Sequence, residues 1–195
     1  RKNVLPLSGR PLIEYTISAA QQSQLIDRVV VSTEDEEIAA ISRTLGAEIR
    51  SRPNRLAEDN ALSIDVVKDV VLSLFEGDNY YADTIILLQP TSPLRTYVHI
   101  DQALRIFRSS NADSLVSVVR IPHSFRPQAL MVVREGYLAS YLSDENTLPL
   151  KRSTDYLYAR NGAAIYIFSY DCLIKKNSLY GDKTVPFEMT ADESI

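Results

Sequence analysis

The sequence predicts an α/β fold, a three-layer sandwich in which helices cover both faces of a mainly parallel sheet. Short aliphatic runs alternate with amphipathic segments of about 10 to 15 residues, which is the pattern of repeated β-α units. The run Ile85-Ile86-Leu87-Leu88 is wholly aliphatic, as expected for a central parallel strand covered on both faces. With 195 residues, 45% of them hydrophobic, the chain is long enough for one core, so we expect a single domain.

Helix signals and apolar runs place the individual elements. Pro11 suits the first turn of a helix at residues 12–24. We expect Thr33 to cap a second helix, at residues 34–45, which Gly46 ends. Further helices are expected at residues 64–75 and 100–107, and strands at residues 28–32, 47–50, 84–88, 114–119 and 163–169.

Residues 121–159 depart from this pattern. Short alternating pieces such as Leu130-Met131-Val132-Val133 surround Gly136 and Pro149. Two or three isolated strands cannot sustain themselves in water without a surface to cover. We therefore expect a small β-rich dimerisation arm that packs on a second copy of the chain, giving a homodimer.

Composition argues against several classes of function. The chain mixes 21 basic and 25 acidic residues, with a net charge of −4, so no nucleic acid partner is expected. Cys172 is the one cysteine, which fits a reducing, cytoplasmic location, and no zinc-ligand spacing is present. The apolar runs are far shorter than the roughly 20 residues that cross a bilayer, so no membrane association is expected. Because the chain begins with Arg1 rather than Met, we expect it to be part of a longer protein.

Polar segments follow several predicted strands, at the sheet edge where open α/β proteins bind ligands. Residues 89–95 place one amide, two hydroxyls and a guanidinium near a strand tip, although a proline-stiffened turn explains the same residues. Residues 32–35 are equally explained by helix capping.

Two further segments combine basic and polar side chains. Residues 52–63 lead into a helix whose N-terminal amides could hold a nucleotide, although a solvated loop is the alternative. A turn at Asn161-Gly162 explains part of residues 158–166, but it does not explain the neighbouring Arg160.

Several motifs occur in one characteristic order. The most specific are Leu-Leu-Gln-Pro-Thr-Ser-Pro-Leu-Arg at residues 87–95 and Arg-Pro-x-x-Leu-Ala-x-Asp at residues 52–59. The others are Lys2-Asn3, Gly9-Arg10-Pro11-Leu12-Ile13, Val31-Ser32-Thr33-Glu34, and Asn161-Gly162 before Tyr166. Together they resemble the acylneuraminate cytidylyltransferases over nearly the whole chain. The resemblance implies a Rossmann-like nucleotidyltransferase sheet, and a dimer whose arm brings basic residues across the interface.

The resemblance also implies a role for individual residues. These are Lys2 for phosphate charge, Asn3 for the ribose, Arg52, Ala61 and Ser63 for the cytosine pocket, Gln89 facing both substrates, and Arg126, Arg152 (or Lys151) and Tyr166 for the sugar acid. Lys2 and Gln89 are the candidate catalytic residues. An arginine suits the sugar carboxylate because its planar fork donates two hydrogen bonds at once.

The implied reaction transfers CMP from CTP to the anomeric hydroxyl of a nine-carbon 2-keto sugar acid and releases pyrophosphate. Mg²⁺ is the implied cofactor, and no metal ligand is expected among residues 1–195 because the family's Asp-x-Asp pair lies beyond them. Alternatives are a cytidylyltransferase for the eight-carbon lipopolysaccharide sugar, and a non-catalytic nucleotide-sugar binding module. Sialic, legionaminic and pseudaminic acids and the deaminated form all remain open as substrates.

Overall fold

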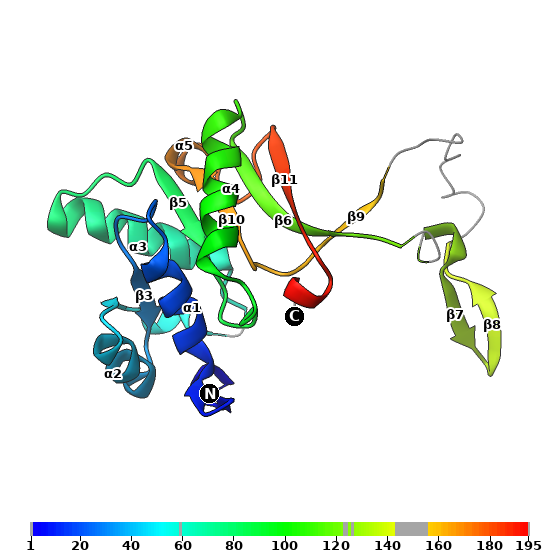
Figure 1. The fold of residues 1–195 in the computed structure, drawn as a ribbon, viewed down its shortest axis with the longest axis horizontal. Helices are drawn as coiled ribbons and strands as arrows, with labels where there is room; N and C mark the ends of the chain where they lie inside the picture. The colour runs from blue at the N-terminus through cyan, green and yellow to red at the C-terminus, as the bar shows by residue number, and fades with distance from the viewer. Residues whose placement is uncertain (1, 59, 123–124, 126, 143–155, 195) are drawn as a thin grey trace.

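The computed structural model describes residues 2–58, 60–122, 125, 127–142 and 156–194, and its body is a three-layer α/β sandwich, as predicted (Figure 1). Its helices are α1 (Leu12–Gln22), α2 (Glu36–Thr44), α3 (Ser63–Asp78), α4 (Tyr97–Ser109) and α5 (Tyr170–Ile174). Its strands are β1 (Pro6–Leu7), β2 (Arg10–Pro11), β3 (Val30–Thr33), β4 (Glu48–Ser51), β5 (Thr84–Leu87), β6 (Ser114–Arg120), β7 (Met131–Arg134), β8 (Tyr137–Ser140), β9 (Tyr158–Arg160), β10 (Tyr166–Ser169) and β11 (Thr184–Met189). None of the helices in the described part of the chain has both the length and the apolarity that a membrane span requires.

The central sheet is mixed rather than mainly parallel. Its strand order is β11-β6-β10-β5, with β9 paired to β6, while β3 and β4 form a separate parallel pair. Strand β11 runs parallel to β6, but β10 runs antiparallel to both β5 and β6. The strand predicted to be central, β5, therefore lies at an edge. Its aliphatic run indicates that both faces are covered, but it carries no information about strand neighbours.

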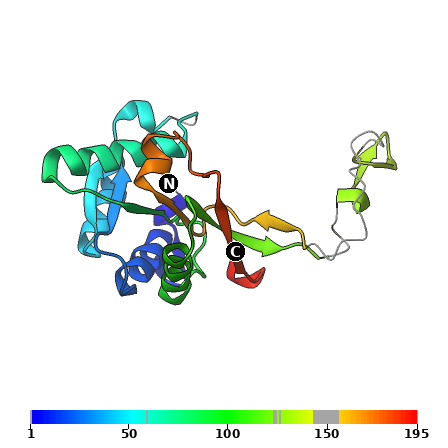
Figure 2. The same ribbon diagram turned by 90° about the horizontal axis from the view of Figure 1, so that it is seen from above.

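Helices cover both faces of the central sheet, as the view from above shows (Figure 2). Leu115 of β6 and Ile167 of β10 pack toward one face, with side chains of α1 and α4. Val116 and Phe168, the next residues along the same strands, pack toward the other face with α3 and α5. The period of two residues along a strand thus divides the apolar core into two layers.

The residue that caps α2 differs from the prediction. Asp35, not Thr33, is the N-cap, because its Oδ1 accepts hydrogen bonds from the N–H groups of Glu37 (2.9 Å) and Ile38 (3.2 Å). The Thr33 hydroxyl accepts instead from the N–H of Asp35 (3.1 Å). Either side chain can accept a first-turn N–H, and only the backbone path decides which one lies within reach.

Strands β7 and β8 form an antiparallel hairpin that Figures 1 and 2 both show apart from the body. Glu135 and Gly136 join them with φ of 51° and 86°, the left-handed pair that a tight two-residue hairpin turn requires. The arm was predicted to extend to residue 159, but β9, which begins at Tyr158, pairs with β6 and belongs to the central sheet. Pro149 lies outside the described residues.

Among the elements not expected from the sequence are the two-residue strands β1 and β2, the helix α5 and the strand β11. Helix α5 has only five residues, too few to show a helical period. Strand β11 carries Pro186 and pairs with β6 at the edge of the sheet, the position that tolerates proline.

Candidate functional site

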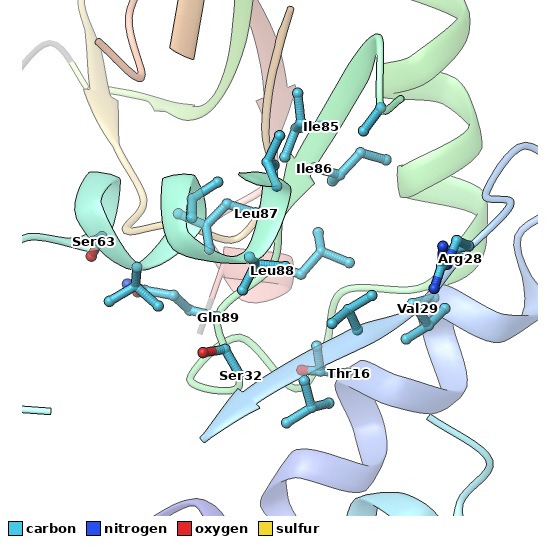
Figure 3. Close-up of a pocket in the computed structure, with 18 of the residues that line it drawn as sticks. Thr16, Arg28, Val29, Ser32, Ser63, Ile85, Ile86, Leu87, Leu88 and Gln89 are labelled. Carbon is cyan, nitrogen blue, oxygen red and sulfur yellow. The ribbon is translucent and has the colours of Figure 1, made fainter. Parts of the chain in front are cut away.

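A cavity of about 580 Å³ lies between β3 and β5 (Figure 3). No backbone hydrogen bond joins these two strands in the described part of the chain, so the cavity separates the β3–β4 pair from the central sheet. Its deeper walls are apolar and come from α1, α3, β3 and β5. Its polar residues near the carboxyl ends of the strands are Asn3, Ser32, Thr33, Glu34, Arg52, Glu58, Ser63 and Gln89.

The structure brings five of the predicted site residues to this cavity. They are Asn3 from the 3₁₀ turn Lys2–Val4, Arg52 after β4, Ala61 and Ser63 at the start of α3, and Gln89 after β5. Lys2 is exposed in the same turn as Asn3 but does not line the cavity. Segments far apart in the sequence therefore converge on one opening.

Arg52 is held at the rim by β3. Its backbone N–H donates to the carbonyl of Thr33 (3.0 Å), which extends the β3–β4 ladder by one residue. Its guanidinium donates to the carbonyl of Ser32 and lies 3.6 Å from the carboxylate of Glu34. The side chain is partly exposed, so its positive charge remains accessible to an anion in the cavity.

The N-terminus of α3 faces the same opening, where it places Ser63. Leu62 occupies the N-cap position, and no side chain caps the helix there. The first N–H groups of a helix have no partner within the helix, and they favour anions. A basic side chain and an uncapped helix start thus lie on one rim, a combination suited to phosphate.

Gln89 is fixed on both sides of its backbone. Its N–H donates to the carbonyl of Ala163 (2.9 Å), and its own carbonyl accepts from the guanidinium of Arg95 (3.1 Å). Figure 3 shows its side chain near Ser32 and Ser63 at the opening. The amide is therefore presented to a ligand from a rigid strand end.

Thr16 belongs to the cavity wall but was not singled out from the sequence. Its hydroxyl accepts a hydrogen bond from Arg95 (2.6 Å). One signal was present, since Thr16 is a polar residue in the apolar stripe of α1, between Ile13 and Ile17.

The predicted sugar-binding residues are not gathered in the described structure. Tyr166 is only 7% exposed, packs against α3 and α5, and does not line the cavity. Burial is the main cause that raises the pKa of Tyr166 to about 12, and the hydroxyl of Tyr180 lies 3.5 Å from its own hydroxyl. Arg126, Lys151 and Arg152 lie outside the described residues. The sugar half of the site stays a prediction.

Metal ligands are not clustered in the part of the chain that the structure describes. No group of three or more His, Cys, Asp or Glu there could hold a metal ion. Mg²⁺ is usually held by one or two carboxylates together with water and substrate phosphates, and no dedicated ligand set is assigned among the described residues.

A cavity at the carboxyl ends of strands, with a basic side chain and an uncapped helix start on its rim, is the arrangement in which α/β proteins bind nucleotides. The chain belongs to the cytidylyltransferase family, a family of nucleotidyltransferases, whose pattern matches residues 1–192.

Individual relatives agree with this membership. The chain is 33% identical over 197 residues to CMP-N,N'-diacetyllegionaminic acid synthase of Legionella pneumophila, covering 100% of the chain and 82% of that protein. It is 30% identical over 194 residues to N-acylneuraminate cytidylyltransferase of Escherichia coli O18:K1:H7, covering 100% of the chain but 44% of that protein. The chain thus spans less than half the length of the second relative.

A solved structure agrees with the fold. CMP:2-keto-3-deoxy-manno-octonic acid synthetase, complexed with CTP, matches with a TM-score of 0.69 at 18% identity, over 97% of this chain and 83% of that one. At this identity the likeness supports the fold alone.

Proposed function

We propose that the protein transfers CMP from CTP to the anomeric hydroxyl of a nine-carbon 2-keto sugar acid, sialic acid or a related nonulosonic acid. One observation carries the proposal. Five residues that the family resemblance assigns to the substrates come from four separate segments and line one cavity. Membership of the cytidylyltransferase family supports the same activity, as do relatives named for sialic and legionaminic acids.

The proposed reaction replaces the phosphoanhydride bond between the α- and β-phosphates of CTP with a phosphodiester bond to the sugar. The sugar hydroxyl oxygen attacks the α-phosphorus, the bond to the bridging oxygen breaks, and pyrophosphate leaves with the bonding electrons while the hydroxyl proton passes to water. Such transfers depend on positioning and on charge stabilisation. Lys2 would balance phosphate charge, and Gln89 would orient the two substrates. Arg52 and the start of α3 would hold the cytidine end of the nucleotide.

The nucleotide choice is proposed to lie in residues 52–63. Ala61 and Ser63 place a backbone segment and a hydroxyl beside Arg52 at the cavity rim. A pyrimidine edge can be read by a few such groups, set too close together to admit a purine. CTP is therefore the proposed nucleotide.

A homodimer is proposed to complete the sugar pocket. Val133 of β7 and Leu138 of β8 are cross-strand partners, yet they are 66% and 70% exposed. An isolated hairpin with apolar side chains in water is marginal, so a second copy is the proposed cover. Arg126 and Arg152 would then reach the partner's site. A Val133→Glu variant that stays dimeric by light scattering would count against this interface.

Pyrophosphate release tests the activity. The protein would be incubated with CTP, Mg²⁺ and a panel of sialic, legionaminic, pseudaminic and eight-carbon sugar acids. Release with a nine-carbon acid supports the proposal, and release with the eight-carbon acid alone supports the alternative cytidylyltransferase. CTP binding without release supports the binding module. Loss of release on chelation by EDTA, restored by Mg²⁺, tests the proposed cofactor, and cell fractionation tests the proposed cytoplasmic location.

A further inference from the structure

Arg95 is a buried cation that has no counter-charge among the described residues. Its side chain lies in the turn between β5 and α4 and is 2% exposed. It forms no ion pair with any described residue; its Nη1 donates to the carbonyls of Gln89 (3.1 Å) and Ala164 (2.8 Å), and its Nη2 donates to the Thr16 hydroxyl (2.6 Å). Its Nε has no hydrogen-bond partner within the described structure.

Burial of this group is unfavourable for stability. A guanidinium that loses its water shell is costly when its partners are neutral, and burial lowers the pKa of Arg95 to about 10. Arg95 nevertheless remains charged near neutral pH. Apolar residues can often replace buried charges without loss of stability. Packing alone therefore gives no reason for an arginine here.

The hydrogen bonds of Arg95 join three segments at the carboxyl end of the cavity. Gln89 follows β5, Ala164 precedes β10, and Thr16 lies in α1. Gln89 and Thr16 both line the cavity, whereas Arg95 does not. Because the carbonyl of Gln89 is held by Arg95 and its N–H by Ala163, the direction in which the Gln89 side chain leaves the strand is fixed.

We infer that Arg95 is a positioning residue for the transfer reaction, which holds the peptide of Gln89 so that its amide faces the substrates. The inference rests on the proposed function. Arg95 donates to three acceptors that lie in different directions, which the planar fork of a guanidinium allows. The single nitrogen of a lysine cannot reach all three in the same geometry.

A double-mutant cycle tests the inference. Pyrophosphate release would be measured for the wild type, Arg95→Met, Gln89→Ala and the double variant. If Arg95 acts through Gln89, each single change lowers kcat by roughly tenfold or more, and the double variant loses little beyond Gln89→Ala. The inference would be overturned if the fold-loss in kcat of the double variant equalled the product of the two single losses. An unchanged kcat in Arg95→Met would overturn it as well. A wild type that releases no pyrophosphate would instead reject the proposed function.

Two further variants exclude a merely structural effect. Arg105→Met is the control, because Arg105 is exposed on α4 and its ion pair with Asp101 is long (3.9 Å). It should leave kcat unchanged. If Arg95→Met does not unfold cooperatively, it is not properly folded, and Arg95→Lys is measured in its place. This variant should also have a lower kcat, while its KM for CTP changes little. Full turnover in a folded Arg95→Lys variant would show that the fork is not needed.

Discussion

The body has a closed half, around β6 and β10, and an open half, around β3 and β5. Both contain aliphatic side chains, but these are buried to different degrees. Strands β6 and β10 each lie between neighbours, and Leu115 and Ile167 are 0% exposed. Strands β3 and β5 each have one neighbour in the described structure, and Val31 and Ile86 are only partly buried because they line the cavity. The closed half stabilises the fold, and the open half leaves room for a ligand. Substitutions in the two halves should therefore differ in what they cost.

The largest effect is expected in the closed half. Leu115→Ala leaves a void among fully buried side chains, so it should lower the free energy of unfolding by about 3 kcal/mol. Ile86→Ala removes a side chain that already borders a cavity, so its cost should be about 1 kcal/mol. Urea unfolding of both variants measures the difference. Equal costs would show that the two halves are packed alike.

The next effect concerns activity at the open half. Gln89→Ala should lower turnover by roughly tenfold to a hundredfold, because an amide oriented for the substrates is lost. Its unfolding transition should change little, since the backbone bonds of Gln89 do not involve the side chain. Steady-state pyrophosphate release and circular dichroism are the measurements. A folded variant with the wild-type rate would show that residues 89–95 form a turn without a role in the reaction.

A smaller effect is expected on nucleotide affinity. Arg52→Ala should weaken CTP binding about tenfold, or about 1.4 kcal/mol, because a positive charge is lost from the rim. Arg55→Ala is the control, since Arg55 is exposed in the same loop and pairs with Asp69. Calorimetry with CTP and ATP measures both affinity and selectivity. ATP binding as tight as CTP would contradict the assignment of residues 52–63.

The smallest effect is expected at the other end of the cavity. Asp78, at the end of α3, accepts hydrogen bonds from Arg28 (2.6 Å) and Arg50, and so connects α3 to the β3–β4 pair. The hydrogen bond from Arg28 lowers the pKa of Asp78. Its contribution is therefore present above the unfolded pKa of about 4 and is lost as the pH falls through the lower folded value.

Asp78→Asn should accordingly destabilise the protein slightly at neutral pH, and the difference from the wild type should shrink below about pH 4. Thermal unfolding across pH measures it. Because these side chains are partly exposed, added salt should reduce the difference as well. A difference that does not change with pH would assign the effect to packing instead of charge.

Much of the fold was predictable because local patterns report burial. Helices α1 to α4 and strands β3 to β6 lie within a few residues of their expected places. The errors about the sheet have one cause, since the residues of a strand do not show which strands it will pair with. The sequence therefore did not reveal that β5 lies at an edge, that β10 runs antiparallel, or that Pro186 lies in β11.

The meeting of several candidate residues at one cavity was predictable for a different reason. Residues at the carboxyl ends of strands meet at one edge of a sheet, so Arg52 and Gln89 could be paired from their places after two strands. Thr16 and Arg95 were not chosen as partners, because a helix and a turn 79 residues apart in sequence meet only through packing.

The sequence by itself determined the α/β class, the alternating layers and the motifs that point to the cytidylyltransferase family, because periodicity and motif order are local properties of the chain. Only the tertiary structure decided which strand edges stay open, that Tyr166 packs with α3 and α5 rather than in the cavity wall, and that Arg95 is buried. These outcomes depend on how distant segments share one volume. Because protein interiors are closely packed, only one side chain can fill a given space, and the local sequence pattern does not show which side chain that will be.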